Sequence, residues 1–186
     1  YAHLIDSIVS KIVYKFSPYN FFDSNATMEF HSKKILFQNP FVIPYLFKSN
    51  VNINQKVEKD IDFIFVGRNH PKKRLDLVNY LIRILSLKIK KAKFLCIVAG
   101  EIFRPFSSLL ASDINIEIQY NIKNSEVQNY LKRSKFYLQL SDYEGMSMTT
   151  VEAIQNSVLP IIRPVGELKN ILNDSNSIII KGDNKI

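Results

Sequence analysis

The chain has 186 residues, of which 46% are hydrophobic and 23% charged, and this globular composition excludes a largely disordered protein. Its 25 basic and 17 acidic side chains give a net charge of +8, spread over short clusters rather than one continuous arm of the kind that binds nucleic acid. Because Cys96 is the only cysteine, the sequence excludes a disulfide within the chain and a cysteine-cluster metal site. No apolar run approaches the roughly 18 residues that a membrane-spanning helix needs.

The first 60 residues predict no independent core. Residues 4–16 and the segment from Asn25 to Ile35 favour two helices. The prolines within residues 39–44 then favour an extended stretch, and residues 48–60 are polar and typical of a linker. We therefore interpret residues 1–60 as the tail of a preceding domain with an interdomain linker, and we expect the chain to be a piece of a longer protein.

From Ile61 onward, short apolar runs alternate with amphipathic stretches. Because these runs are apolar at nearly every residue, they are typical of parallel strands buried on both faces by the intervening helices. The sequence therefore predicts an α/β fold over residues 61–186, a doubly wound, Rossmann-like parallel sheet. The expected strands lie at residues 62–66, 93–98, 115–120, 136–140, 159–162 and 177–180, and the expected helices at about 78–85, 127–131 (capped by Asn124 or Ser125), 146–156 and 166–172.

Two carboxylates follow the fourth predicted strand, within the sequence EGMSMTTVE. Glu144 lies in the turn after the strand and Glu152 inside the next helix. Ligands of doubly wound sheets bind beyond the carboxyl ends of the strands, and the N–H groups at the helix start, near Met148 and Thr149, favour an anion such as phosphate. Carboxylates on either side can accept hydrogen bonds from hydroxyl groups, which matches a nucleoside diphosphate linked to a sugar. The alternative is a pair of ordinary solvated carboxylates.

Two cations follow the first predicted strand, at the opening of the first helix. On a doubly wound sheet, Arg68 and Lys73 project into the same crevice as the loop that carries Glu144. Together they can neutralise a diphosphate, the arginine by a bidentate contact and the lysine as a point charge. The alternative is a solvated basic helix start, which is the simpler interpretation of Lys72 and Arg74.

These motifs carry a family resemblance. Residues 61 to about 183 resemble the carboxyl-terminal, donor-binding domain of the retaining glycosyltransferases of the glycogen-synthase-like superfamily (glycosyl transferases group 1, GT-B fold), and residues 1–60 look similar to the end of the amino-terminal domain. In that family a Gly-Arg pair ends the first strand and a lysine follows five residues later, as Gly67, Arg68 and Lys73 do here. The family signature S-x-x-E-G-F-G-x-x-x-x-E-A is matched by Ser141, Glu144, Gly145, Glu152 and Ala153.

The chain departs from the family pattern at four positions where glycine is common. Arg74 follows the lysine, and Ser147 replaces the second glycine of the signature. Ser157 stands after the helix, and Glu167 replaces the second glycine of a Gly-Gly turn. These losses leave open a non-catalytic partner subunit of a glycosyltransferase, although the charged positions of the motifs are all retained.

The resemblance implies a metal-independent transfer of sugar from a nucleotide-diphosphate sugar, with retention of anomeric configuration and with no cofactor. Cationic side chains and a helix end stabilise the diphosphate in such enzymes, and the 3 histidines of the sequence are not clustered. The resemblance places Ile122 at a position whose backbone contacts the nucleotide base. The alternative is that Ile122 is an ordinary apolar residue before a helix. The resemblance implies that Arg68, Lys73 and the backbone N–H groups of Met148 and Thr149 stabilise the leaving group. It implies that Glu144 contacts the sugar hydroxyls and that Glu152 contacts the ribose. Gly67 and Gly145 would line the donor site.

The expected acceptor is a saccharide or a lipid-linked molecule, in bacterial surface polysaccharide or glycolipid assembly. We expect a cytoplasmic location; the net charge of +8 fits peripheral contact with an anionic membrane face, or simply solubility and a basic cleft. Acceptor groups would come mainly from the amino-terminal domain, so we expect the chain alone to bind a nucleotide sugar weakly and to transfer poorly. The remaining alternatives are a nucleotide-sugar epimerase of the same fold and nucleic-acid binding, which no aromatic and basic platform supports.

Overall fold

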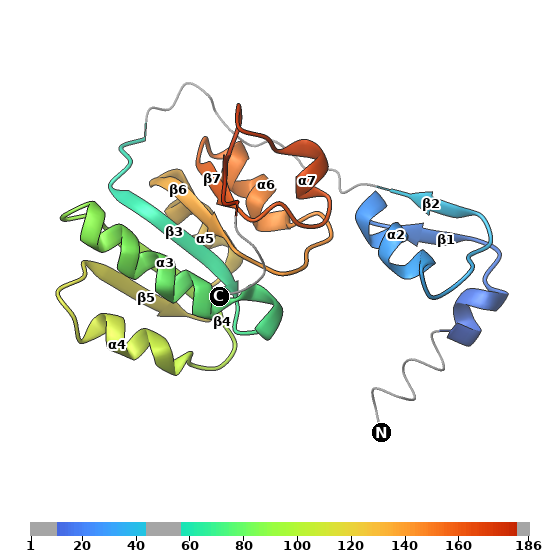
Figure 1. The fold of residues 1–186 in the computed structure, drawn as a ribbon, viewed down its shortest axis with the longest axis horizontal. Coiled ribbons are helices and arrows are strands. Elements are labelled where there is room, and N and C mark those ends of the chain that lie inside the picture. The colour runs from blue at the N-terminus through green and yellow to red at the C-terminus, as the bar shows by residue number, and fades with distance from the viewer. Residues whose placement is uncertain (1–10, 44–56, 182–186) are drawn as a thin grey trace.

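The computed structural model describes residues 11–43 and 57–181, which form a small amino-terminal unit and a larger α/β domain (Figure 1). Residues 11–16 of the first predicted helix are helical. The rest of that helix, residues 4–10, lies outside the described residues, as do residues 48–56 of the predicted linker.

The larger domain is built on a six-stranded sheet in which all neighbouring strands are parallel. The strands are β3 (Ile61–Arg68), β4 (Phe94–Ala99), β5 (Ile116–Tyr120), β6 (Ser134–Gln139), β7 (Leu159–Ile162) and β8 (Ile178–Ile179). Their order is β5-β4-β3-β6-β7-β8, so the direction in which strands are added reverses between β3 and β6. This order defines a doubly wound sheet and confirms the predicted fold class.

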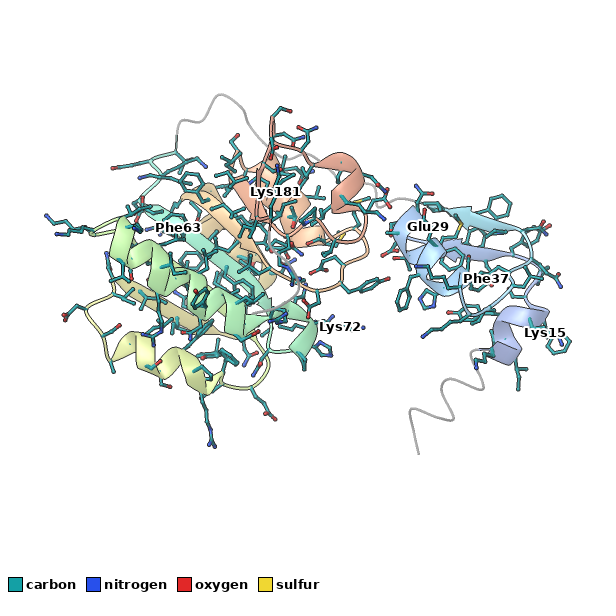
Figure 2. All side chains as sticks on the ribbon, viewed as in Figure 1. Lys15, Glu29, Phe37, Phe63, Lys72 and Lys181 are labelled. Carbon is teal, nitrogen blue, oxygen red and sulfur yellow. The ribbon has the colours of Figure 1, made fainter. Side chains whose placement is uncertain are left out.

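Helices cover both faces of this sheet, as the apolar character of its strands requires (Figure 1). They are α3 (Leu75–Lys88), α4 (Ser107–Leu110), α5 (Asn124–Lys132), α6 (Met148–Gln155) and α7 (Leu168–Ile171). Phe63 of β3 belongs to the core shared with α3 and α4, whereas Ile64 belongs to the core shared with α5 and α6. Phe63, labelled in Figure 2, stacks on Phe94 and on Phe136 with 5.2 Å between ring centroids in each pair, so an aromatic row crosses three neighbouring strands.

One stretch of structure was not predicted, and one local prediction was wrong. The sequence analysis assigned no element between β4 and β5, where the structure has a 3₁₀ turn, η2 (Arg104–Phe106), followed by α4. These elements are too short to show a helical period, and burial of Phe106 and Leu109 holds them in the core. Neither Asn124 nor Ser125 caps α5, because the helix already includes Asn124 and the preceding Lys123 makes no capping hydrogen bond.

The amino-terminal unit contains two short parallel strands, β1 (Asn20–Phe22) and β2 (Pro40–Val42), and helix α2 (Asn25–Ser32) between them (Figure 1). The helix begins where the sequence predicts it, because the Ser24 hydroxyl accepts a 3.1 Å hydrogen bond from the Thr27 N–H group. It ends at Ser32, earlier than expected. Leu36, beyond the end of this helix, is 92% exposed.

Three of the four positions where glycine was expected adopt the left-handed backbone conformation. The φ angle is +50° at Arg74, +53° at Ser147 and +55° at Ser157. Glycine populates this region freely, whereas other residues are strained there by about 1–2 kcal/mol. The backbone at these three positions therefore keeps a conformation that suits glycine. Replacement of glycine by arginine or serine does not indicate that the site is rearranged. This finding weakens the case for a non-catalytic subunit.

Replacement of Ser157 by glycine is expected to stabilise the protein. Ser157 is exposed, follows Asn156 at the carboxyl end of α6 and has a positive φ, so a glycine relieves strain without removing packing. We expect the Ser157→Gly change to raise the free energy of unfolding by about 0.5–1 kcal/mol in urea denaturation. Ser125→Gly, at an exposed position inside α5, is the matched control and should lower it by about 0.5 kcal/mol. Equal effects of the two changes would contradict this account.

Candidate functional site

A pocket of about 430 Å³ lies at the carboxyl ends of the central strands, where the order of the sheet reverses. Ligands of doubly wound sheets bind at this switch point, because the loops from neighbouring strands diverge there to opposite faces. The pocket contains all but one of the residues singled out from the sequence. These lining residues are Gly67, Arg68, Lys73, Ile122, Glu144, Gly145, Met148 and Thr149.

The two predicted cations reach the pocket from the loop after β3. Arg68 is the last residue of β3, and Lys73 lies in a 3₁₀ turn, η1 (Pro71–Lys73), so both precede α3 rather than open it. His70 supports this turn, since its Nδ1 accepts a 3.2 Å hydrogen bond from the Lys72 N–H group. The Arg68 side chain is exposed and makes no hydrogen bond or ion pair within residues 11–43 and 57–181. Its guanidinium donors are therefore available to a ligand.

Lys73 and Glu144, which both line the pocket, form an ion pair. The distance from Lys73 Nζ to Glu144 Oε1 is 2.6 Å, and the two side chains are 26% and 12% exposed. The same oxygen accepts a 2.6 Å hydrogen bond from Ser141 Oγ, and Gln139 Nε2 lies 3.5 Å away. An ammonium group has three N–H donors, so the ion pair orients Lys73 and leaves two donors for an anionic ligand.

Further contacts tie the loop after β3 to the loop after β6. The Asp142 N–H group donates a 2.9 Å hydrogen bond to the carbonyl of Lys72, and the Arg74 guanidinium lies 3.0 Å from the Asp142 carboxylate. Arg163 also pairs with Asp142. Lys72, labelled in Figure 2, lies with its Nζ 5.4 Å from the ring centroid of Tyr143. The backbone hydrogen bond and the ion pairs of Asp142 hold the backbone on which Lys73 and Glu144 are presented.

The amino-terminal end of α6 borders the pocket. Ser147 directly precedes α6, but its hydroxyl bonds the Thr150 hydroxyl at 2.8 Å and does not cap the helix. Among the described residues, the N–H groups of Met148 and Thr149 have no hydrogen-bond acceptor. A helix start with free N–H groups stabilises an anion through its dipole and through direct hydrogen bonds.

Glu152 is the predicted site residue that does not line the pocket. It lies one turn into α6, where it is half-buried. Burial raises the pKa of its carboxyl group above the ordinary value, and a hydrogen bond from Gln128 of α5 offsets part of this effect. Contact between Glu152 and a ribose stays a prediction.

The loop after β7 packs on the loop that carries Glu144. A Cβ atom on Gly166 would stand 1.7 Å from the carbonyl oxygen of Glu144, so only glycine permits this approach. The φ angle of Gly166 is +58°, which glycine also favours. The following residue, Glu167, donates a 3.0 Å hydrogen bond from its N–H group to the carbonyl of Gly145.

Glu167 also joins the larger domain to the amino-terminal unit. Its Oε2 accepts a 2.9 Å hydrogen bond from the Ala26 N–H group, in the first turn of α2, and Asn170 Nδ2 lies 3.3 Å from its Oε1. Burial alone would raise the pKa of Glu167, but the hydrogen bonds from Ala26, Asn170 and Asn25 outweigh burial and lower it. Glu167 is thus an anion at a helix start, an arrangement that the helix dipole stabilises.

Three residues at the site were missed or given no role by sequence reasoning. Asp23 lines the pocket from the amino-terminal unit, and the side chains of Ser141 and Gln139 lie against Glu144. Ser141 belongs to the family signature, so its position was a usable signal. Nothing local distinguishes Asp23 or Gln139, because each acquires its place through the folding of segments that are distant along the chain.

Within residues 11–43 and 57–181, no group of three His, Cys, Asp or Glu side chains is arranged to hold a metal ion. None of the helices in the same part of the chain combines the length and the apolar character that crossing a bilayer demands.

Comparison with solved structures places the fold among known proteins. A mutant of S. aureus TarM in complex with fondaparinux, alpha-GlcNAc-glycerol and UDP superposes with a TM-score of 0.80 at 17% identity, over 96% of this chain and 36% of that one. The pneumococcal O-GlcNAc transferase GtfA, in complex with UDP and GlcNAc, superposes with a TM-score of 0.68 at 19% identity, over 90% of this chain and 34% of GtfA. Sucrose-phosphate synthase from Thermosynechococcus elongatus superposes with a TM-score of 0.74 at 14% identity, over 95% of this chain and 48% of the synthase.

At these identities the similarity establishes the fold alone, and the chain spans only 34% to 48% of the lengths of the three proteins. No curated protein sequence matches the chain significantly. The family model for glycosyl transferases group 1, however, matches residues 47–185, a range that includes the whole pocket except Asp23. The chain therefore belongs to the glycosyl transferases group 1 family.

Proposed function

We propose that the pocket binds a nucleotide-diphosphate sugar, and that the protein transfers the sugar to a saccharide or lipid-linked acceptor. The observation that carries this proposal is the meeting of Arg68, Lys73 and the uncapped start of α6 around one pocket at the switch point of the sheet. Two cations and free N–H groups at one place favour a diphosphate. The family match supports the same activity.

The lining of the pocket suggests how a donor lies in it. The diphosphate lies against Arg68, Lys73 and the N–H groups of Met148 and Thr149. The nucleoside extends towards Ile122 and the start of α5, and the sugar lies beside Glu144. UDP is the proposed nucleotide, because TarM and GtfA, which share this fold, were each crystallised with UDP.

The proposed chemistry is stabilisation of the leaving nucleoside diphosphate. As the bond from the sugar to the diphosphate breaks, negative charge grows on the phosphate oxygens, and fixed cations and helix N–H groups stabilise that charge. The Lys73–Glu144 ion pair keeps the ammonium group in place before the reaction, so little reorganisation is needed. In this proposal the cations do the work that a metal ion does in other transferases, and the anomeric configuration is retained as in the family resemblance.

The acceptor side of the proposal depends on parts of the protein beyond this pocket. We propose a polysaccharide or glycolipid pathway at the cytoplasmic membrane face, with peripheral contact through basic side chains. Several of these are paired in the structure, since Lys93 and Arg133 lie within 3.1 Å and 2.6 Å of Asp60 and Lys135 lies 2.8 Å from Asp62. Such pairing reduces the charge that they offer to anionic lipid, so any membrane attraction must come from the unpaired basic residues.

Donor screening tests the proposed function. Titration calorimetry of the protein with UDP, GDP and ADP sugars should show one preferred nucleotide. Arg68→Ala should weaken binding of the preferred nucleotide sugar by about 10- to 100-fold, because a charge-assisted hydrogen bond to a phosphate is lost. Lys72→Ala is the matched control: Lys72 is exposed, does not line the pocket, and should leave the affinity within about twofold. If wild type binds no nucleotide sugar, or both variants behave alike, the proposed function is wrong.

A further inference from the structure

The pocket contains one carboxylate that comes from the amino-terminal unit. Asp23 lies between β1 and α2 and is half-buried at the wall of the pocket. Its Oδ2 lies 2.9 Å from the point where a Cβ atom on Gly145 would stand. The carboxylate therefore approaches the backbone of Gly145 because that residue has no side chain.

Asp23 retains most of its capacity to accept hydrogen bonds. Its Oδ1 accepts a 3.2 Å hydrogen bond from Ser24 Oγ, and it forms no ion pair with any residue that the structure describes. An ionised carboxylate can accept about four hydrogen bonds. Glu144 differs in this respect, because Lys73 and Ser141 already occupy the same Oε1 atom.

The charges around the pocket decide which part of a ligand Asp23 faces. Arg68 and Lys73 attract the diphosphate, whereas the negative charge of Asp23 repels it. Asp23 lies beside Gly145, which directly follows Glu144, and both carboxylates thus border the same side of the pocket. An uncharged, hydroxyl-rich group is the partner that suits two neighbouring carboxylates.

Contacts of α2 hold Asp23 at this position. The Ala26 N–H group donates to the buried carboxylate of Glu167, and the ring of Phe30 lies 4.8 Å from that of Tyr143. The Ser24 cap fixes the backbone between Asp23 and the helix. The amino-terminal unit is therefore attached to the loop that carries Glu144, through Tyr143, and to the loop after β7, through Glu167.

We propose that the Asp23 carboxylate accepts a hydrogen bond from a hydroxyl group of the donor's sugar, so that the amino-terminal unit completes the donor site. This inference rests on the proposed function, since it needs a nucleotide sugar in the pocket. It adds a sugar-binding residue that lies outside the matched family region and outside the motifs of the sequence.

The test compares a donor with and without its sugar. Calorimetry of the full chain measures the affinities for UDP and for UDP-N-acetylglucosamine in wild type, Asp23→Ala, Asp23→Asn and Glu29→Ala. We expect Asp23→Ala to weaken binding of UDP-N-acetylglucosamine by about 10- to 100-fold and to leave UDP binding as tight as in wild type or tighter, with Asp23→Asn intermediate. Glu29, labelled in Figure 2, is an exposed carboxylate of α2 that does not line the pocket, and its change should affect neither ligand.

Release of free N-acetylglucosamine from the donor, measured without any acceptor, tests whether the hydroxyl group that Asp23 binds belongs to the donor's sugar. A slower release by Asp23→Ala supports contact with the donor's sugar. Unchanged binding and release, or equal weakening of UDP and UDP-N-acetylglucosamine, overturns the inference. If Asp23→Ala lowers the unfolding temperature and does not fold, Asp23→Asn decides between the same outcomes. Failure of wild type to bind any of the UDP, GDP and ADP sugars is a different result, because it refutes the proposed function itself.

Discussion

Lys73→Met is expected to lower the rate of sugar transfer by about 100- to 1,000-fold, because a fixed cation near the leaving diphosphate is lost. Methionine keeps much of the side-chain length and apolar volume, so the change removes charge more than packing. It also leaves the Glu144 carboxylate, which is only 12% exposed, with hydrogen bonds from Ser141 and Gln139 alone. Steady-state kinetics with the preferred donor measure the effect, and kcat should fall more than KM rises.

Lys72→Met is the matched control for this prediction. Lys72 is the neighbouring residue of the same turn, is exposed, and contacts Tyr143 rather than the pocket. We expect its kcat to stay within about twofold of wild type. Comparable losses of kcat in both variants would mean that the general basic character of the loop, and not the Lys73–Glu144 pair, supports the reaction.

Gly166→Ala is expected to cost on the order of 4 kcal/mol of unfolding free energy, an unusually large effect for one methyl group. The new Cβ atom would stand 1.7 Å from a backbone oxygen of Glu144, and neither backbone can yield without moving its loop. The positive φ of Gly166 adds strain of about 1–2 kcal/mol. Because displacement of the Glu144 loop also separates Glu144 from Lys73, donor affinity should fall together with stability.

Gly100→Ala separates the two causes of that loss. Gly100 also has a positive φ, +102°, but a Cβ atom there would meet nothing within 4 Å. Its replacement therefore carries backbone strain without a clash, and we expect a loss of about 1–2 kcal/mol in urea denaturation. If Gly166→Ala cost no more than Gly100→Ala, the close packing of the loops after β6 and β7 would be incorrect.

The glycine departures show how a sequence motif and a backbone can disagree. From the sequence, Arg74, Ser147 and Ser157 resemble losses of function, since each stands where the family has glycine. In the structure all three keep a positive φ. Arg74 gains compensation through its ion pairs with Asp76 and Asp142, and Ser147 through its hydrogen bond to Thr150.

The sequence by itself determined the elements and their order, because strand and helix patterns are local. The apolar runs from residue 61 onward predicted all six strands of the sheet, and strand–helix alternation predicted that the sheet is parallel. The order of motifs also predicted which segments carry charge to the pocket, since Arg68 ends one strand, and Lys73 and Glu144 follow strands that end at the same edge. These properties depend on residues a few positions apart.

Only the tertiary structure decided how the site is closed and supported. Ala26 and Glu167 are 141 residues apart along the chain, and no periodicity or spacing predicts that they share a hydrogen bond. The same holds for Asp23 beside Gly145 and for Gly166 against Glu144, where contact depends on the exact path of three separate loops. Such contacts form only when distant segments pack together, so local patterns in the sequence do not predict them.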